Sequence, residues 1–347
     1  MRNNLVFSEN SAFLITDVFN RRYYSGVNCD EGYLVLLPSK CFYFADARYF
    51  YALKEKVKDK NTVALLYKSD EDIKNLLMKE KVTTLYIDFD RITLSEYQRI
   101  KEICADVKNG TCYLQEARMT KDQTEINNIK KACEIAKNAF EHVIPFIKSG
   151  VTEITIKNRL ERFMKKQGAE DVSFSTIVAF GKNSAVPHHQ TGRTRLKKNQ
   201  AVLMDFGCVV NGYCSDITRT VFYGEPDEKF KQTFYQVAAA NLLGMDRAIP
   251  LKRTSQVDGE VREYFSGLGV ADKFTHSLGH GVGLEIHETP RLSPKGQEII
   301  KNGMVFTIEP GLYYDGEFGV RIENTVLMED GVAKSLTGNG RELIIIR

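Results

Sequence analysis

The sequence lacks the features that mark membrane, secreted or nucleic-acid-binding proteins. No apolar run approaches the ~18 residues that a membrane-spanning helix needs, and the segment Met1–Phe13 has no hydrophobic signal core. The seven cysteines are scattered and include no CxxC pair, which indicates free thiols in a reducing cytoplasm. The formal net charge of +3 comes with no long basic run, so neither nucleic acid nor a membrane is expected as a partner. We therefore expect a cytoplasmic globular protein.

The length of the chain favours two domains. Its 347 residues are many for one core, while 43% hydrophobic and 27% charged residues are ordinary for a globular protein. In the first third, Tyr33–Leu37 and Phe42–Ala45 are typical of a hairpin, and Val63–Tyr67 and Thr84–Asp88 of further strands. Lys- and Glu-rich helical segments separate these runs. This alternation predicts a small layered domain that ends near Glu116.

Three helices are expected in the rest of the chain. Thr120 and Gln123 have the spacing of a capping box, and the residues after them repeat apolar side chains every three or four positions. A second amphipathic helix is predicted from near Thr152 to Gly168, and a third around Lys229–Ala248. The remaining sequence, from Phe174 onward, is dominated by strand-like runs.

Two aspartates lie on a predicted hairpin. Its two β-rich segments are joined by Asn211-Gly212, the dipeptide most typical of a two-residue turn. Such a turn places Asp205 opposite Thr218 and Asp216 opposite Gly207, so both aspartates share one face of the hairpin. As diagonal neighbours they lie roughly 7–8 Å apart at the backbone, close enough to reach ions between them. The alternative is a surface-facing pair, which the apolar flanking residues disfavour.

A second acidic pair, Glu309 and Glu323, flanks Asp315-Gly316. A two-residue turn at that dipeptide would place Glu323 on the face opposite to Glu309. A three-residue loop, or a β-bulge at Pro310-Gly311 or at Gly319, would bring the two glutamates to one face. We adopt such a register because the metal hypothesis requires it.

Between the two acidic pairs lies a glycine-rich segment with histidines. His280 stands among Gly279, Gly281 and Gly283, and five of the six histidines lie between positions 188 and 287. A single histidine is often structural, but carboxylates in apolar segments take up protons unless cations accompany them. Several carboxylates with imidazole form the ligand set of a divalent metal ion, which suggests a metal-dependent enzyme.

Together these motifs resemble the pita-bread metallopeptidases, in particular the aminopeptidase P and prolidase branch, which cleaves Xaa-Pro bonds. The resemblance rests on the segments Met204–Gly207, Asp216–Thr220, His276–Pro290, Ile308–Gly311 and Val320–Glu323, with a weaker match at Tyr24–Gly26 and Asp46–Tyr49. It implies an α+β fold in which a smaller mixed α/β creatinase-type domain (1–116) precedes a pita-bread catalytic domain (117–347). The latter is a curved antiparallel sheet covered by helices. A homodimer is also implied.

The same resemblance implies a site for two divalent metal ions. Asp205 would bind one ion, His280 and Glu309 the other, and Asp216 and Glu323 would bridge both. The oxygen-rich ligand set favours manganese, with cobalt, zinc and iron as alternatives. A hydroxide that bridges the ions would attack the carbonyl before proline in Xaa-Pro dipeptides or at the N-terminus of Xaa-Pro peptides.

Catalytic roles also follow from the resemblance. Glu309 would carry a proton to the leaving nitrogen, and His188 and His287 would hydrogen-bond the reaction intermediate and the substrate. His276 is either a substrate contact or a structural residue. The chain departs from many relatives at His189-Gln190, which follows His188 where they carry a glycine, so the shape of this loop is left open.

Two arginines are candidate substrate-binding residues. Arg291 resembles a prolidase arginine that holds the C-terminal carboxylate of a dipeptide, although a loop arginine is as often solvated. Arg321 would do similar work or would orient Glu323. The substrates implied are small proline-containing peptides, with dipeptidase and aminopeptidase activity both open. The alternative is a noncatalytic pita-bread module that binds a peptide or protein, but such modules are expected to lose ligands, and all five positions are occupied here.

Overall fold

The computed structural model describes Leu5 and residues 7–347. Part of the segment Met1–Phe13, for which no signal core is expected, therefore lies outside the described residues. The chain divides into two compact units, Met1–Arg118 and Met119–Arg347. Within the described part of the chain, no helix combines the length and the apolar character needed to cross a membrane.

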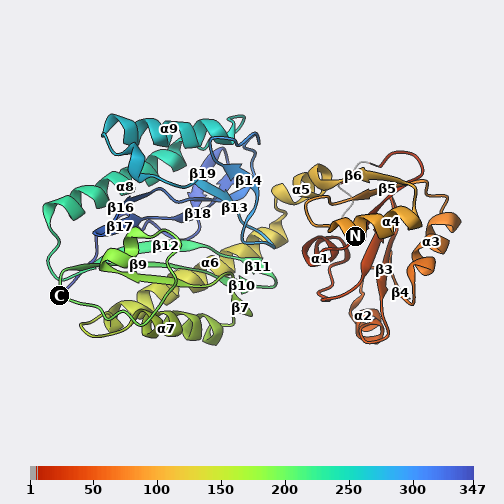
Figure 1. Ribbon diagram of the computed structural model, residues 1–347, viewed down its shortest axis with the longest axis horizontal. Helices are drawn as coiled ribbons and strands as arrows, with labels where there is room; N and C mark the ends of the chain where they lie inside the picture. Colours follow the sequence, from red (N-terminus) through yellow and green to blue (C-terminus); the bar gives the residue numbers. More distant parts are fainter. Residues whose placement is uncertain (1–4, 6) are drawn as a thin grey trace. The chain divides into compact units, whose positions relative to one another are not determined.

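The first unit contains a six-stranded mixed sheet with connecting helices (Figure 1). Its elements are β1 (Ser11–Ile15), α1 (Val18–Ser25), β2 (Tyr33–Leu36), β3 (Cys41–Ala45), α2 (Phe50–Lys56), β4 (Thr62–Leu66), α3 (Asp70–Lys79), β5 (Thr84–Ile87), α4 (Leu94–Ile103), β6 (Asp106–Asn109) and α5 (Thr111–Met119). The strand order is β4-β3-β2-β1-β5-β6. The predicted hairpin is confirmed, because β2 and β3 pair antiparallel with Tyr33 opposite Phe44. The domain boundary expected after Glu116 falls within α5.

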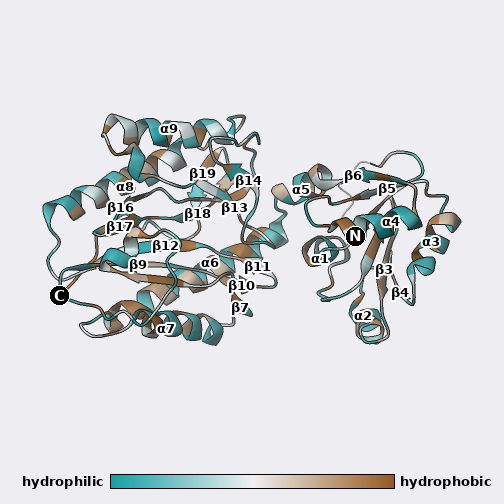
Figure 2. Cartoon of the chain, viewed as in Figure 1, coloured by the Kyte–Doolittle hydropathy of each residue, from teal (hydrophilic) through white to brown (hydrophobic). Residues whose placement is uncertain are grey.

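Burial of apolar side chains holds this unit together. Leu14 and Phe44 of the sheet pack in one cluster with Ile73 and Leu77 of α3 and Ile100 of α4. Figure 2 shows the hydrophobic colour along β3 and the hydrophilic colour over much of α4, whose outer face meets solvent. Apolar side chains that recur every two residues in the strands and every three or four in the helices thus account for the layered packing.

The second unit holds helices on two sides of several sheets, whose strands pair antiparallel except for the parallel pair of β12 and β20. Its helices are α6 (Gln123–Val143), α7 (Glu153–Lys166), α8 (Glu228–Arg247) and α9 (Thr254–Gly267). Its strands are β7 (Asp171–Val172), β8 (Ile177–Phe180), β9 (Gln200–Phe206), β10 (Cys208–Val210), β11 (Tyr213–Cys214), β12 (Ile217–Tyr223), β13 (Gly279–Gly281), β14 (Glu288–Leu292), β15 (Val305–Ile308), β16 (Gly311–Tyr314), β17 (Phe318–Arg321), β18 (Asn324–Glu329), β19 (Val332–Ser335) and β20 (Ile345–Ile346).

Two apolar clusters separate the layers of this unit. One joins α6 and α7 to β8, β9 and β12, and the other joins α8 and α9 to β15, β16 and β18. Figure 1 shows the strands between these two pairs of helices. The two layers of helices leave the strands that carry or flank the candidate ligands in the middle of the unit.

Two helix predictions need correction. The first long helix begins after Asp122, whose carboxylate accepts a hydrogen bond from the backbone N–H of Glu125, so Thr120 and Gln123 do not form the cap. Thr120 instead forms an isolated bridge with Met304. The sequence analysis also missed α9, although its buried Val257, Val261 and Phe265 recur every four residues. The helices predicted from Thr152 and around Lys229 are confirmed.

The aspartate hairpin has the predicted register. Val210 lies opposite Tyr213, and Asp205 lies opposite Thr218, as the two-residue turn requires. Asn211 and Gly212 both have positive φ, 47° and 77°, which is the conformation that this dipeptide favours in such turns. The turn therefore fixes which face of the hairpin carries the carboxylates.

The glutamate hairpin has a three-residue loop. Tyr314 pairs with Phe318, which leaves positions 315–317 in the loop. The same register continues beyond the loop, where Ile308 pairs with Asn324, so the β-bulge alternative is wrong. This register places Glu309 opposite Glu323 and directs both side chains to one face.

Candidate metal centre

All the candidate site residues line one pocket of about 470 Å³ in the second unit. The pocket contains side chains from the aspartate hairpin, the glutamate hairpin, the glycine-rich segment and the loop between β8 and β9. The candidate residues that meet there are His188, Asp205, Asp216, His276, His280, His287, Arg291, Glu309, Arg321 and Glu323. Phe174, Ile177 and Ile286 add apolar surface to the same pocket.

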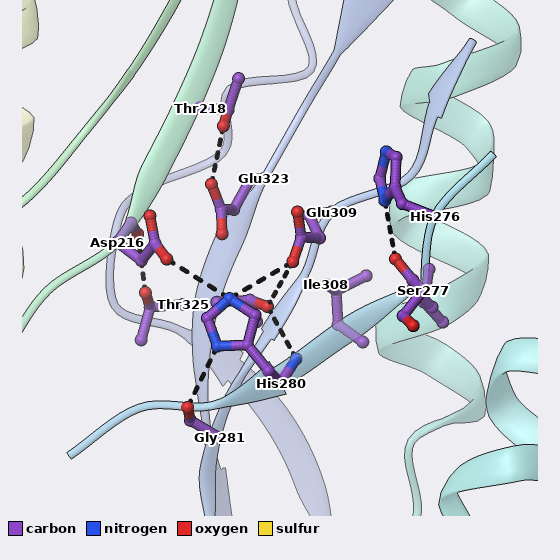
Figure 3. A network of polar contacts seen from close by, with 12 residues as sticks. Asp216, Thr218, His276, Ser277, His280, Gly281, Ile308, Glu309, Glu323 and Thr325 are labelled. Carbon is purple, nitrogen blue, oxygen red and sulfur yellow. Dashed lines mark hydrogen bonds and ion pairs between the residues drawn. The ribbon is translucent and has the colours of Figure 1, made fainter. Parts of the chain in front are cut away.

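The imidazole of His280 faces Asp216, Glu309 and Glu323 (Figure 3). Its Nε2 is 3.5 Å from Asp216 Oδ2 and 3.4 Å from Glu309 Oε1. One ligand atom from each of Asp216, His280 and Glu323 falls within 4.8 Å of the others. His280 Nδ1 donates to the carbonyl of Gly281 at 3.1 Å, so in the neutral ring Nε2 carries a lone pair toward the carboxylates. A lone pair that faces carboxylate oxygens is arranged for a cation between them.

Two buried carboxylate oxygens support the same interpretation. Among the described residues, neither Asp205 Oδ1 nor Asp216 Oδ1 has a hydrogen-bond partner. Leaving a buried acceptor unsatisfied costs about 1–3 kcal/mol, and more when it is charged. Asp205 Oδ2 is 2.6 Å from Arg321 Nη2, so the positive charge of Arg321 reaches one edge of the acidic cluster.

The pKa values of these groups are far from their ordinary range. Burial, followed by repulsion from neighbouring carboxylates, raises the pKa of Asp216 and of Glu323 well above the usual values. Burial also raises the pKa of Glu309 from 4.5 to about 8. The pKa of His280 is lowered to about 3, mainly by burial and then by His287. The cluster therefore combines a neutral imidazole with carboxyl groups whose ionisation is unfavourable. Divalent cations bound there would favour the ionised carboxylates by neutralising their charge.

Threonines on the strands orient the acidic side chains. Thr218 donates to Glu323 Oε2 at 2.7 Å, and Thr307 donates to Glu309 Oε1 at 3.1 Å. Thr325 donates to the carbonyl of Asp216 at 2.7 Å. The sequence analysis missed all three, although period-two alternation places Thr307 on the same face as Glu309.

A chain of hydrogen bonds continues from Arg321 into the pocket wall. Arg321 Nη1 donates to the hydroxyl oxygen of Tyr313 at 2.7 Å, and this hydroxyl lies 2.9 Å from His276 Nε2. His276 Nδ1 donates to the carbonyl of Ser277 at 2.8 Å, so Nε2 accepts the proton of Tyr313. Tyr313 was missed, but the hairpin register, which pairs Arg321 with Gly311, places Tyr313 on the same face as Arg321.

Exposed residues form the mouth of the pocket. The side chains of His188, His287 and Arg291 are exposed, and the rings of His287 and His280 are 4.3 Å apart between centroids. Arg291 lies opposite His280 across β13 and β14. Its guanidinium forms no ion pair or hydrogen bond with another described residue, which leaves it open to a ligand in the pocket.

A buried ion pair involves Glu288, the residue that follows His287 of the pocket mouth. Lys121 Nζ lies 2.8 Å from Glu288 Oε1, and the two side chains are only 1% and 6% exposed. Glu288 begins β14 beside His287 and pairs across the sheet with Gly281. Neither member of the pair was singled out from the sequence, because charged residues are usually solvated.

Known proteins match both units of the chain. The sequence profile of "Metallopeptidase family M24" matches residues 127–330, and that of "Creatinase/Prolidase N-terminal domain" matches residues 2–120. The chain is 34% identical over 340 residues to a Xaa-Pro dipeptidase of Pyrococcus horikoshii, covering 96% of this chain and 94% of the relative.

Solved structures of similar proteins superpose over almost the full length. A Xaa-Pro dipeptidase from Bacillus anthracis has a TM-score of 0.91 at 33% identity, covering 96% of this chain and 95% of that chain. An X-Pro aminopeptidase from Thermotoga maritima has a TM-score of 0.88 at 32% identity, covering 97% of each chain.

Proposed function

The chain belongs to metallopeptidase family M24, and from this membership and the pocket we propose that it hydrolyses the bond before proline in small Xaa-Pro peptides, using two divalent metal ions. The predicted family, the enzyme class and the two-domain fold, a creatinase-type domain followed by a pita-bread domain, are confirmed by the matches to both parts of the chain. The choice of substrate follows relatives that are named Xaa-Pro dipeptidase and X-Pro aminopeptidase.

One observation carries the metal part of the proposal: the neutral imidazole of His280 directs a lone pair at Asp216, whose buried Oδ1 has no hydrogen-bond partner among the described residues. Protons could neutralise such a cluster, but cations would also satisfy the unpartnered oxygens. Four carboxylates and one imidazole are hard to borderline ligands, which suits manganese and permits cobalt, zinc or iron.

The five ligand positions divide between two ions. Asp205 would hold one ion, His280 and Glu309 the other, and Asp216 and Glu323 would be shared. When bound, the two cations would supply Lewis-acid polarisation of the scissile carbonyl and a bridging hydroxide as the nucleophile. The threonine hydroxyls that contact Glu309 and Glu323 would keep these side chains in place during the reaction.

The protein side chains would manage protons and the developing negative charge. As the family resemblance implies, Glu309 would carry a proton to the leaving nitrogen. His188 and His287, at the pocket mouth, would donate hydrogen bonds to the tetrahedral intermediate and to the substrate. His276, held by Tyr313, would contact the substrate from the pocket wall.

The same pocket supports a preference for proline-containing dipeptides. The ring of proline needs an apolar surface, which Phe174, Ile177 and Ile286 offer. The guanidinium of Arg291 is open to the C-terminal carboxylate of a dipeptide, a pair that can bond through two parallel contacts. Arg321 is committed to Asp205 and Tyr313, so it would act on the substrate through these residues.

Metal reconstitution with defined peptides tests the proposal. Protein stripped with a chelator should be inactive, and added Mn²⁺, Co²⁺ or Zn²⁺ should restore proline release from Ala-Pro and Gly-Pro with two ions bound per chain. Ala-Pro-Ala should be cleaved more slowly than Ala-Pro; faster cleavage would reverse the dipeptide preference. A protein that binds peptide yet stays inert after metal addition would be the noncatalytic module. A cytoplasmic homodimer completes the proposal, and light scattering tests the dimer.

A further inference from the structure

The loop that carries His188 is attached to a buried carboxylate from a different element. This loop, residues 181–199, joins β8 to β9, and we call it the His188 loop. Its crest is poorly packed, since Val186 is 51% exposed and His188 and Gln190 are also exposed. Apolar burial therefore does little to fix the direction in which His188 points.

Glu153, the first residue of α7, binds both limbs of the loop. Its side chain is fully buried, and Oε1 accepts from the N–H of Phe180 at 2.9 Å and from Asn183 Nδ2 at 2.8 Å. Oε2 accepts from the N–H of Gly192 at 3.0 Å and from the ring of His189 at 3.1 Å. Four donors satisfy the carboxylate, so it acts as a rigid anchor for the start and the return of the loop.

The crest of the loop is held on both sides of His188. On one side, the carbonyl of Pro187 accepts from Arg321 Nη1 at 3.4 Å. On the other side, the imidazole of His189 reaches back to Glu153.

We propose that Glu153 and His189 are positioning residues, which hold His188 in the pocket through the hydrogen bond between their side chains. The kinetic consequence rests on the proposed peptidase function, in which His188 contacts the substrate. Loss of a hydrogen bond to a charged partner corresponds to about a 10- to 100-fold change in an equilibrium. We expect a loss of kcat/KM of this size when the bond between His189 and Glu153 is removed.

A double-mutant cycle tests whether His189 acts through His188. His189→Phe removes the donor and keeps a ring, and it should lower kcat/KM for Ala-Pro about 10- to 100-fold. In the His188→Ala background the same change should have almost no further effect. His189→Gln retains an N–H donor and should recover much of the activity. Losses that multiply in the double variant, or no loss in His189→Phe, would overturn the proposal.

Amide hydrogen exchange provides a readout that needs no enzyme activity. His189→Phe should speed exchange in peptides that cover 181–194, while the neighbouring exposed change Gln190→Ala should leave both exchange and activity unchanged. Bound metal should match the wild type, because His189 contacts none of the metal-ligand candidates. If His189→Phe speeds exchange but the wild-type protein has no peptidase activity, the peptidase function is refuted and the positioning role is not. Unchanged exchange in His189→Phe would refute the positioning role.

Discussion

Glu309 should make the stability of the metal-free protein fall as the pH rises. Burial raises its pKa from 4.5 to about 8, so above pH 4.5 the folded chain keeps a proton that the unfolded chain has lost. The resulting stabilisation is complete below pH 4.5 and disappears as the pH passes 8. At 1.36 kcal/mol per pH unit the total is about 5 kcal/mol, of which about 2 kcal/mol is lost between pH 6.5 and 8.

Above pH 6.5 the change of stability with pH reflects the buried carboxyl groups rather than His280. The pKa of His280 is lowered from 6.5 to about 3, so its effect has the opposite sign: stability is present above pH 6.5 and is lost as the pH falls toward 3. Above pH 6.5 the imidazole is neutral in both states. Asp216 and Glu323, whose pKa values burial also raises, act in the same direction as Glu309 and steepen the decline.

Urea unfolding with a chelator present, followed by circular dichroism, measures this effect. Because the candidate metal site lies in the second unit, the unfolding transition that Mn²⁺ moves to a higher urea concentration is assigned to that unit. For this transition, the difference in unfolding free energy between wild type and Glu309→Gln should change by about 2 kcal/mol between pH 6.5 and 8. Mn²⁺ should stabilise the wild type more at pH 8 than at pH 6.5, because metal displaces protons. Parallel pH curves for the two proteins would refute the reasoning.

Further variants test other parts of the site. Asp216→Ala or Glu323→Ala should lower bound metal and kcat by at least about 100-fold, since even outer-shell changes cost 10–100-fold; near-normal turnover would contradict the shared-ligand role. Arg291→Met should raise KM for Ala-Pro about 10- to 100-fold with little change in kcat, as expected for lost carboxylate binding. Lys121→Met should lower the unfolding free energy by about 3–5 kcal/mol, and adding Glu288→Leu should recover most of it, because the buried carboxylate that Lys121 neutralised is then gone.

Local rules were enough to predict how the aspartate hairpin presents its carboxylates, whereas the register of the glutamate hairpin was adopted to fit the metal hypothesis. The positive φ of Asn211 and Gly212 set a two-residue turn, and period-two alternation then fixed the faces of Asp205 and Asp216. The three-residue loop before Phe318 was only one of two possibilities from the sequence, because a bulge gives the same alignment of faces. Pairing register decides between them, and it depends on contacts far along the chain.

Long-range contacts explain what the sequence did not reveal. Thr218 and Glu323 are joined by a hydrogen bond across 105 positions, and Glu153 and His189 across 36. No local periodicity encodes such partners, so the side chains that orient the candidate ligands could not be named in advance. The helix cap at Asp122 was missed for a different reason, since Thr120 offers an equally good spacing and only the competing bridge to Met304 excludes it.

The odd loop length of the glutamate hairpin has a consequence for comparing relatives. Adding or deleting one residue among positions 315–317, with no compensating bulge, would turn either Glu309 or Glu323 away from the pocket while every candidate ligand stayed in the sequence. Adding or deleting two would preserve the arrangement. Parity of this loop is therefore a criterion that can separate metal-binding relatives from inert ones where a residue-by-residue alignment finds no difference.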